Sequence, residues 1–194
     1  LQVFSAIYRN ADGTPLFSAQ LEPRFIVAAA LVATVVGLAS APALQRRWWA
    51  SKGSGAFTGK TLLNASRMHV SSVAAVENAS LSYSSVGGWI ASGRGQEFVD
   101  LLRDAWRTRA YGDFWSYMLL AEGAVDIATE PDLALHDMAA LDVIVREAGG
   151  RFTNLDGVPG PVGPGALATN GLLHDELLAR LAPSEPTESI DLVD

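Results

Sequence analysis

Cysteine is absent from this chain, and its absence excludes disulfide bonds and thiolate metal sites. Histidine is scarce: His69, His136 and His174 are the only three, and their spacing fits no zinc motif. Basic residues are outnumbered, with 14 Lys and Arg against 21 Asp and Glu. No wider basic patch surrounds Arg46 and Arg47, so the two tryptophans that follow predict packed indoles on a strand edge rather than a nucleic-acid surface.

Neither a basic region nor a cleavage site follows Leu1, so we expect no secretory signal peptide and a cytoplasmic protein. The length of 194 residues and an apolar fraction of 49% predict one domain with a sizeable core. The net charge is −7, but four acids near the end of the chain leave about −3 for the rest. We therefore predict a domain over residues 1–182 and a disordered acidic tail over 183–194.

The longest uncharged run covers residues 25–44, which matches the length of a membrane span. Its many β-branched residues, together with Gly37 and Pro42, suit strands better than a helix. We therefore predict two consecutive buried strands here, and a membrane-tethered protein is the alternative interpretation.

The most informative stretch covers residues 135–157. After Asp137, apolar residues recur at steps of three and four, which predicts a helix with one buried face, beginning at or just after Asp137. Gly149 and Gly150 are typical of a helix C-terminus, and residues 151–153 then read as a strand. A carboxylate at the start of this helix is either an N-terminal cap or a ligand for a hard cation.

Other patterns predict alternating helices and strands, which indicates an α/β fold. Arg109 ends a short strand and Asp113 precedes a helix, so the local interpretations are a surface ion pair and a helix cap. A guanidinium at a strand end can instead bind a phosphate with two parallel bonds. The remaining predictions are a hairpin turn at 52–57, a helix at 73–78 capped by Ser71 or Ser72, a strand at 79–84, a loop at 87–95, helices at 96–106 and 114–122, strands at 107–110, 124–128 and 166–169, and a last helix from Asn170 or Gly171 to Leu181.

Four motifs occur in an order that resembles the inositol monophosphatase superfamily, and most closely its actinobacterial-type histidinol-phosphatases. The resemblance covers about residues 40–182 and implies a layered α/β sandwich, represented by its later layers. The motifs are YGDF at 111–114, AEGAVDIA at 121–128, D-x-A-A-x-x-x-I-V-x-E-A-G-G at 137–150, and ATNGLLHDE at 168–176.

The resemblance also implies a magnesium site. IYRNADGTPLF, at residues 7–17, is similar to the family's metal motif D-P-[IL]-D-G-T, although Arg9 replaces the first aspartate. By this resemblance Asp12, Asp137 and the Ala11 carbonyl hold Mg²⁺, and Asp12 and Thr14 are catalytic. The backbone N–H groups of Gly13 and Thr14 would bind the phosphate. The further substrate-binding residues that the resemblance implies are Arg109, Asp113 and Asp137, with Glu130 near the family's substrate-side acid.

The expected function is a Mg²⁺-dependent phosphomonoesterase that hydrolyses L-histidinol phosphate to histidinol in histidine biosynthesis. Family members carry an upstream region with a metal-binding glutamate, and we expect this chain to be a truncated or degenerate member with weak activity. Exposed apolar surface would then favour a homodimer. The alternatives are an inositol-1-monophosphatase-like enzyme and, because Arg9 stands in the metal motif, a non-catalytic binding or oligomer partner.

Overall fold

The computed structural model describes residues 46–183, which belong to one compact unit that begins at Arg46. The predictions made for Arg9, for residues 11–14 and 25–44, and for the tail beyond 183 lie outside the described residues. Among the residues described, no helix combines the length and the apolar character that a membrane crossing requires.

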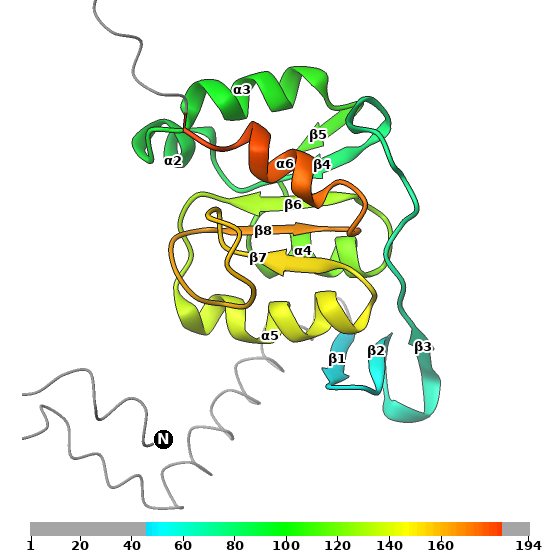
Figure 1. Ribbon diagram of the computed structural model, residues 1–194. Coiled ribbons are helices and arrows are strands. Elements are labelled where there is room, and N and C mark those ends of the chain that lie inside the picture. The colour runs from blue at the N-terminus through cyan, green and yellow to red at the C-terminus, as the bar shows by residue number, and fades with distance from the viewer. Residues whose placement is uncertain (1–45, 184–194) are drawn as a thin grey trace, which may run out of the picture. The chain divides into compact units, whose positions relative to one another are not determined.

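The described residues form two sheets (Figure 1). A three-stranded antiparallel sheet has the order β1-β2-β3, and a five-stranded sheet has the order β5-β4-β6-β8-β7. In the larger sheet β4 is parallel to both β5 and β6, whereas β8 is antiparallel to β6 and β7. The strands are β1 (Arg47–Ser51), β2 (Gly55–Gly59), β3 (Ala65–Arg67), β4 (Ser80–Ser82), β5 (Arg107–Arg109), β6 (Ile127–Glu130), β7 (Arg151–Thr153) and β8 (Ala166–Thr169).

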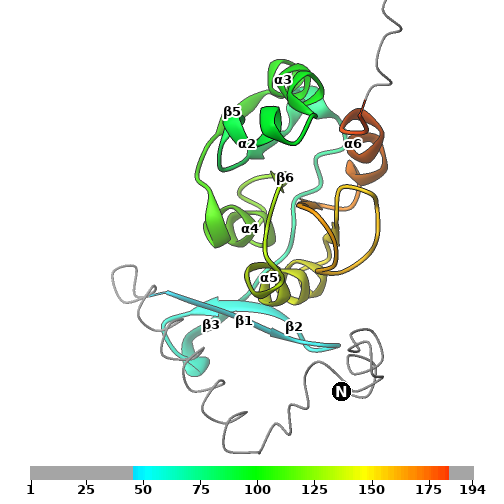
Figure 2. The ribbon, with the colours of Figure 1, turned by 90° about the vertical axis from the view of Figure 1, so that its left-hand side faces the viewer.

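The helices cover both faces of the larger sheet. Figure 2 shows α2, α3 and α6 on one side, α4 and α5 on the other, and the smaller sheet beyond α5. The predicted layered α/β sandwich is therefore confirmed. The helices are α2 (Val86–Ala91), α3 (Gly95–Asp104), α4 (Asp113–Ala121), α5 (Leu135–Glu147) and α6 (His174–Arg180), with short 3₁₀ turns η2 (Leu62–Asn64) and η3 (Val76–Asn78).

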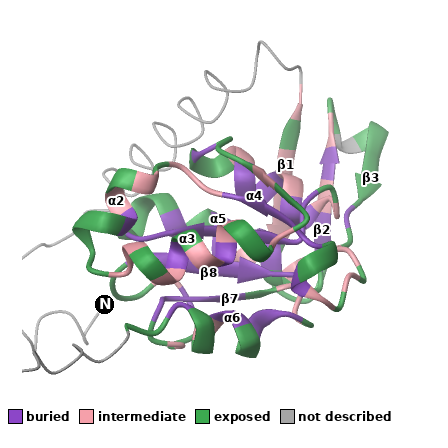
Figure 3. Cartoon of the chain, turned by 90° about the horizontal axis from the view of Figure 1, so that it is seen from above, coloured by how far each residue is buried: buried purple, intermediate pink, exposed green. Residues whose placement is uncertain are grey.

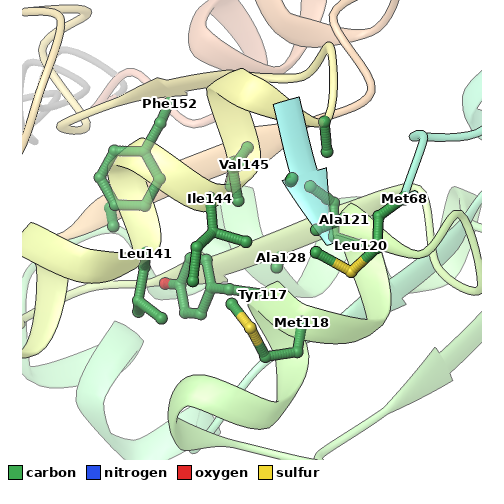
Figure 4. Close-up of a cluster of buried hydrophobic side chains, with 14 of the residues drawn as sticks. Met68, Tyr117, Met118, Leu120, Ala121, Ala128, Leu141, Ile144, Val145 and Phe152 are labelled. Atoms are coloured by element: carbon green, nitrogen blue, oxygen red, sulfur yellow. The ribbon is translucent and has the colours of Figure 1, made fainter. Parts of the chain in front are cut away.

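Strand alternation divides the core between these layers. On β6, Ile127 packs toward α2, α3 and α6, whereas Ala128 packs toward α4 and α5. Leu167 and Ala168 on β8 divide in the same way, because successive side chains on a strand point to opposite faces. Figure 3 shows the resulting burial of β8, and Figure 4 shows Tyr117 among Leu141, Met118 and other buried side chains of α4 and α5.

Several local predictions are confirmed. The turn at 52–57 joins the antiparallel strands β1 and β2, and residues 151–153 and 166–169 are β7 and β8. The two tryptophans of β1 pack as expected: Trp48 contacts the rings of Phe114 and Trp115, and Trp49 stacks on Phe57. Helix α5 ends before Gly149, whose φ of 93° is the left-handed conformation that a glycine cap supplies.

Four predictions of local structure are wrong. The predicted loop at 87–95 contains α2, because Trp89 stacks on Phe98 with ring centroids 4.3 Å apart and this packing outweighs two helix-breaking glycines. The predicted strand at 124–128 is β6, which begins three residues later. The last helix begins at His174 rather than at Asn170 or Gly171. Ser71 caps no helix and instead donates a hydrogen bond to the Asp126 carboxylate.

His174 is buried between the last two strands and α6. Its two ring nitrogens lie 3.0 Å from the hydroxyl oxygens of Thr153 and Thr169. Burial lowers the pKa of His174 from 6.5 to about 4, and the positive charge of Arg151 contributes to this decrease. The negative charge of Asp175 acts in the opposite direction. Between pH 6.5 and about 4 the folded protein therefore holds a neutral imidazole where an unfolded chain would be protonated.

This difference predicts acid sensitivity. Between pH 6.5 and about 4 the unfolded chain binds a proton at His174 that the folded chain does not. The free energy of unfolding therefore decreases by roughly 3 kcal/mol as the pH is lowered through this window. Urea unfolding at several pH values measures the slope. His174→Gln should flatten it, whereas His69→Gln, at an exposed histidine, should leave it unchanged. Equal slopes in wild type and His174→Gln would contradict this interpretation.

Candidate active site

The carboxyl ends of the parallel strands β4, β5 and β6 lie at one edge of the larger sheet. Arg109 ends β5 and Glu130 ends β6. Because the chain turns back into a helix after each of these strands, the N-termini of α4 and α5 follow at the same edge. Ligand sites of α/β proteins form at such edges, where helix N-termini favour negative charge.

A cleft of about 230 Å³ opens between the first turns of α4 and α5. Two carboxylates and a hydroxyl share its wall with apolar side chains, so it suits a small molecule that is apolar in part and carries a cationic group or binds with a cation. The lining residues are Asp113, Phe114, Tyr117, Leu133, Asp137 and Leu141.

Asp137 lies in the first turn of α5, two residues after the helix begins at Leu135. The predicted helix start at or just after Asp137 is therefore wrong, and so is the cap interpretation, because Ala134 occupies the cap position and makes no side-chain cap bond. The Asp137 side chain is half exposed, and the Nε2 atom of the His136 ring lies 3.6 Å from its Oδ1 atom. A carboxylate that faces a cleft without a structural hydrogen bond has the chemistry of a cation ligand, and that role remains a prediction.

Asp113 is the first residue of α4, and Gly112 rather than Asp113 is the cap residue, so this cap prediction is also wrong. Gly112 has a φ of 72° and Asp113 a φ of 47°. An aspartate in the left-handed region is strained, and such strain persists where the surrounding structure holds the residue in place. The result is an exposed carboxylate at the rim of the cleft, where it is available to a substrate.

Glu130 is buried to all but 5% of its surface. Burial is the largest cause that raises the pKa of its carboxyl to about 7, and the negative charges of Asp113 and Asp137 raise it further. A hydrogen bond from the Ser84 side chain acts in the opposite direction. Three acids therefore interact at this edge of the sheet, and the buried one can be neutral or ionised near neutral pH.

Arg109 does not line the cleft. Its side chain is exposed and donates a hydrogen bond to the Thr108 carbonyl oxygen, 2.8 Å away. No ion pair to Arg109 occurs within residues 46–183, so the local prediction of a surface ion pair finds no partner there. A phosphate-binding role would need the guanidinium to turn toward a ligand.

The described residues alone do not form a complete metal site. No group of three potential ligands among His, Asp and Glu comes together within residues 46–183. Hard divalent cations bind six or more oxygen atoms, several of them from protein. Asp137 fits as one donor, and the other predicted donors, Asp12 and the Ala11 carbonyl, lie outside the described residues.

The sequence interpretation missed Tyr117, which lines the cleft from α4. Its side chain is fully buried, and its hydroxyl has no hydrogen-bond partner within the part of the chain described. The signal was available in the spacing, since Tyr117 lies four residues after Asp113 and therefore on the same face of the helix. Local sequence did not distinguish this tyrosine from an ordinary core residue.

The fold is that of a known family. The sequence model of the Inositol monophosphatase family matches residues 12–186, and the chain belongs to that family. The chain is 60% identical over 147 residues to the histidinol-phosphatase of Streptomyces coelicolor, covering 76% of this chain and 55% of that protein. It is also 60% identical over 146 residues to the histidinol-phosphatase of Mycobacterium tuberculosis, covering 75% of this chain and 56% of that protein.

Solved structures agree with the fold. An inositol monophosphatase (IMPase) of Thermotoga maritima aligns with a TM-score of 0.62 at 29% identity, covering 73% of this chain and 53% of that one. An inositol monophosphatase of Zymomonas mobilis aligns with a TM-score of 0.64 at 25% identity, covering 72% and 54%. The chain spans about half the length of the relatives that it matches.

Proposed function

We propose that this chain contributes to a Mg²⁺-dependent phosphomonoesterase that hydrolyses L-histidinol phosphate to L-histidinol and phosphate, a cytoplasmic and homodimeric enzyme of histidine biosynthesis. The observation that carries the proposal is the 60% identity to two histidinol-phosphatases over three quarters of the chain. The acidic cleft supports it, because L-histidinol phosphate has a protonated amine that Asp113 and Glu130 can attract.

In this proposal Asp137, Asp12 and the Ala11 carbonyl hold the ion. When bound, Mg²⁺ lowers the pKa of a coordinated water and offsets charge on the leaving oxygen. Groups of the chain itself bind the phosphate and position the attacking water. The backbone N–H groups of Gly13 and Thr14 bind phosphate oxygens, and the Thr14 hydroxyl orients the water. Arg109 turns its guanidinium to the phosphate with two parallel bonds.

A phosphatase assay tests the proposal. The 194-residue chain and a form extended upstream to the length of full relatives are assayed with L-histidinol phosphate and Mg²⁺, with myo-inositol 1-phosphate as the comparison substrate. We expect the extended form to hydrolyse L-histidinol phosphate preferentially and to lose activity by about 100-fold or more when a chelator removes the metal.

Preference for the inositol phosphate would favour an inositol-1-monophosphatase-like enzyme instead. The absence of hydrolysis in both forms would refute the proposal, and calorimetry would then distinguish the non-catalytic alternative, which should bind no Mg²⁺ tightly.

A further inference from the structure

Two buried polar atoms without a hydrogen-bond partner among the described residues occur near this edge of the sheet, one of them in the wall of the cleft. They are the hydroxyl oxygen of Tyr117 on α4 and the Oε1 atom of Glu130 at the end of β6. Five such side-chain atoms occur within residues 46–183, and these two belong to residues that interact with each other electrostatically. A buried polar atom that lacks a partner costs about 1–3 kcal/mol, so two at one site indicate that something completes them.

The two groups are chemically complementary. The tyrosine hydroxyl can donate a hydrogen bond, and an ionised carboxylate can only accept. Burial, and secondarily the negative charge of Glu130, raises the pKa of Tyr117 well above its usual value of 10, so this hydroxyl keeps its proton. Ser84 already donates to the carboxyl of Glu130, and Oε1 is the oxygen left for a second donor.

The groups that act on Glu130 come from each neighbouring element. Asp113 belongs to α4, Asp137 to α5, and Ser84 follows β4, while the four residues of β8, which pairs with β6, carry no charge. The two charged neighbours are both negative. A site of this composition favours a cationic group. The Tyr117 hydroxyl, which lines the cleft and has no partner among the described residues, is a second and independent indication that a ligand or water binds here.

We propose that Tyr117 is a positioning residue for Glu130: its hydroxyl donates a hydrogen bond to a water molecule that donates in turn to Oε1 of the ionised carboxylate, and this bridge fixes the carboxylate toward a protonated amine of the substrate. This inference rests on the proposed function for the identity of the cation. Tyr117 acts through Glu130 and contacts no reacting atom.

Tyr117→Phe tests the inference, because it removes one oxygen and keeps the ring that packs near Phe152. We expect kcat/KM for L-histidinol phosphate to fall about 10-fold, mainly through KM, since the group lost orients a binding carboxylate. The kcat/KM for p-nitrophenyl phosphate, which has no amine, should stay unchanged. The melting temperature should stay within a few degrees of wild type, because the variant loses one water-mediated hydrogen bond and keeps the packed ring.

Tyr83→Phe is the matched control, since Tyr83 packs on Phe98 in the other core cluster. Tyr83→Phe should leave kcat/KM unchanged for both L-histidinol phosphate and p-nitrophenyl phosphate. An equal loss on both substrates with a lower melting temperature in Tyr117→Phe would mean a purely structural role, and no loss on either substrate would also overturn the proposal.

A measurement without substrate separates this inference from the proposed function. Carboxyl ¹³C NMR follows the titration of Glu130, and Tyr117→Phe should raise its midpoint above that of wild type, because a donor to the ionised form is lost. An unchanged midpoint would refute the proposed interaction between Tyr117 and Glu130, even if the enzyme hydrolyses L-histidinol phosphate. A raised midpoint in a protein that does not hydrolyse this substrate would support the interaction between Tyr117 and Glu130 and refute only the assigned substrate.

Discussion

Asp137→Asn is expected to lower phosphatase activity on L-histidinol phosphate by about 100-fold or more while the protein stays folded. The substitution keeps the shape of the side chain and removes the charge with which a carboxylate binds a divalent cation. Asp137 is half exposed and makes no cap bond, so the change removes little that supports α5. A loss of about 100-fold corresponds to about 2.7 kcal/mol of transition-state stabilisation.

The measurement is kcat/KM on the form that the phosphatase assay shows to be active, together with calorimetric Mg²⁺ titration and the melting temperature. Asp132→Asn is the control, because Asp132 is exposed and does not line the cleft. Both variants should melt within about 2 °C of wild type. Full activity in Asp137→Asn would refute the proposal that Asp137 is a metal ligand, and only the similarity of fold to the family would then stand.

Asp126→Ala is expected to be the most destabilising substitution proposed, at about 3 kcal/mol. The buried carboxylate of Asp126 accepts hydrogen bonds from the Ser71 hydroxyl and from the Ser80 backbone N–H, the latter at 2.6 Å. The Asn170 side chain donates to the same Ser71 hydroxyl. Removing the acceptor leaves buried donors unpaired between β4, β6 and the turn after β8, and each orphaned group costs about 1–3 kcal/mol.

Denaturant unfolding measures this loss, and the melting temperature should fall by roughly 10 °C in a unit of this size. Asp132→Ala provides the comparison, since an exposed aspartate should change the free energy of unfolding by less than about 0.5 kcal/mol. A loss under about 1 kcal/mol in Asp126→Ala would show that water replaces the carboxylate in this network.

The Asp126 network also explains two of the motifs that carry the family resemblance. AEGAVDIA contains Asp126, and ATNGLLHDE contains Asn170 and His174, each of which is buried with its polar atoms bonded. A substantial part of the recognisable sequence therefore joins neighbouring strands of the larger sheet to one another and to the segments beside them. These motifs identify the family without being parts of the cleft.

The sequence by itself determined the family, the layered α/β fold and the elements whose signals are local. The apolar period of α5, the glycines after it and the hairpin turn at 52–57 act within a few residues, so their interpretation needed no tertiary information. The same signals placed Asp113 and Asp137 at helix starts. They misjudged the caps, because a helix can begin one or two residues earlier when neighbouring residues satisfy its first turn.

Only the tertiary structure decided which groups meet at the cleft and which are buried. Glu130 is separated from Tyr117 by the second half of α4, the following turn and most of β6, and sequence gives no measure of how deeply a strand-end carboxylate is covered. Helix α2 likewise forms because Trp89 finds Phe98 to stack on, against the preference of its own glycines. Burial and ionisation depend on packing between distant segments, which is why the pairing at this site emerged from the fold and not from the motif.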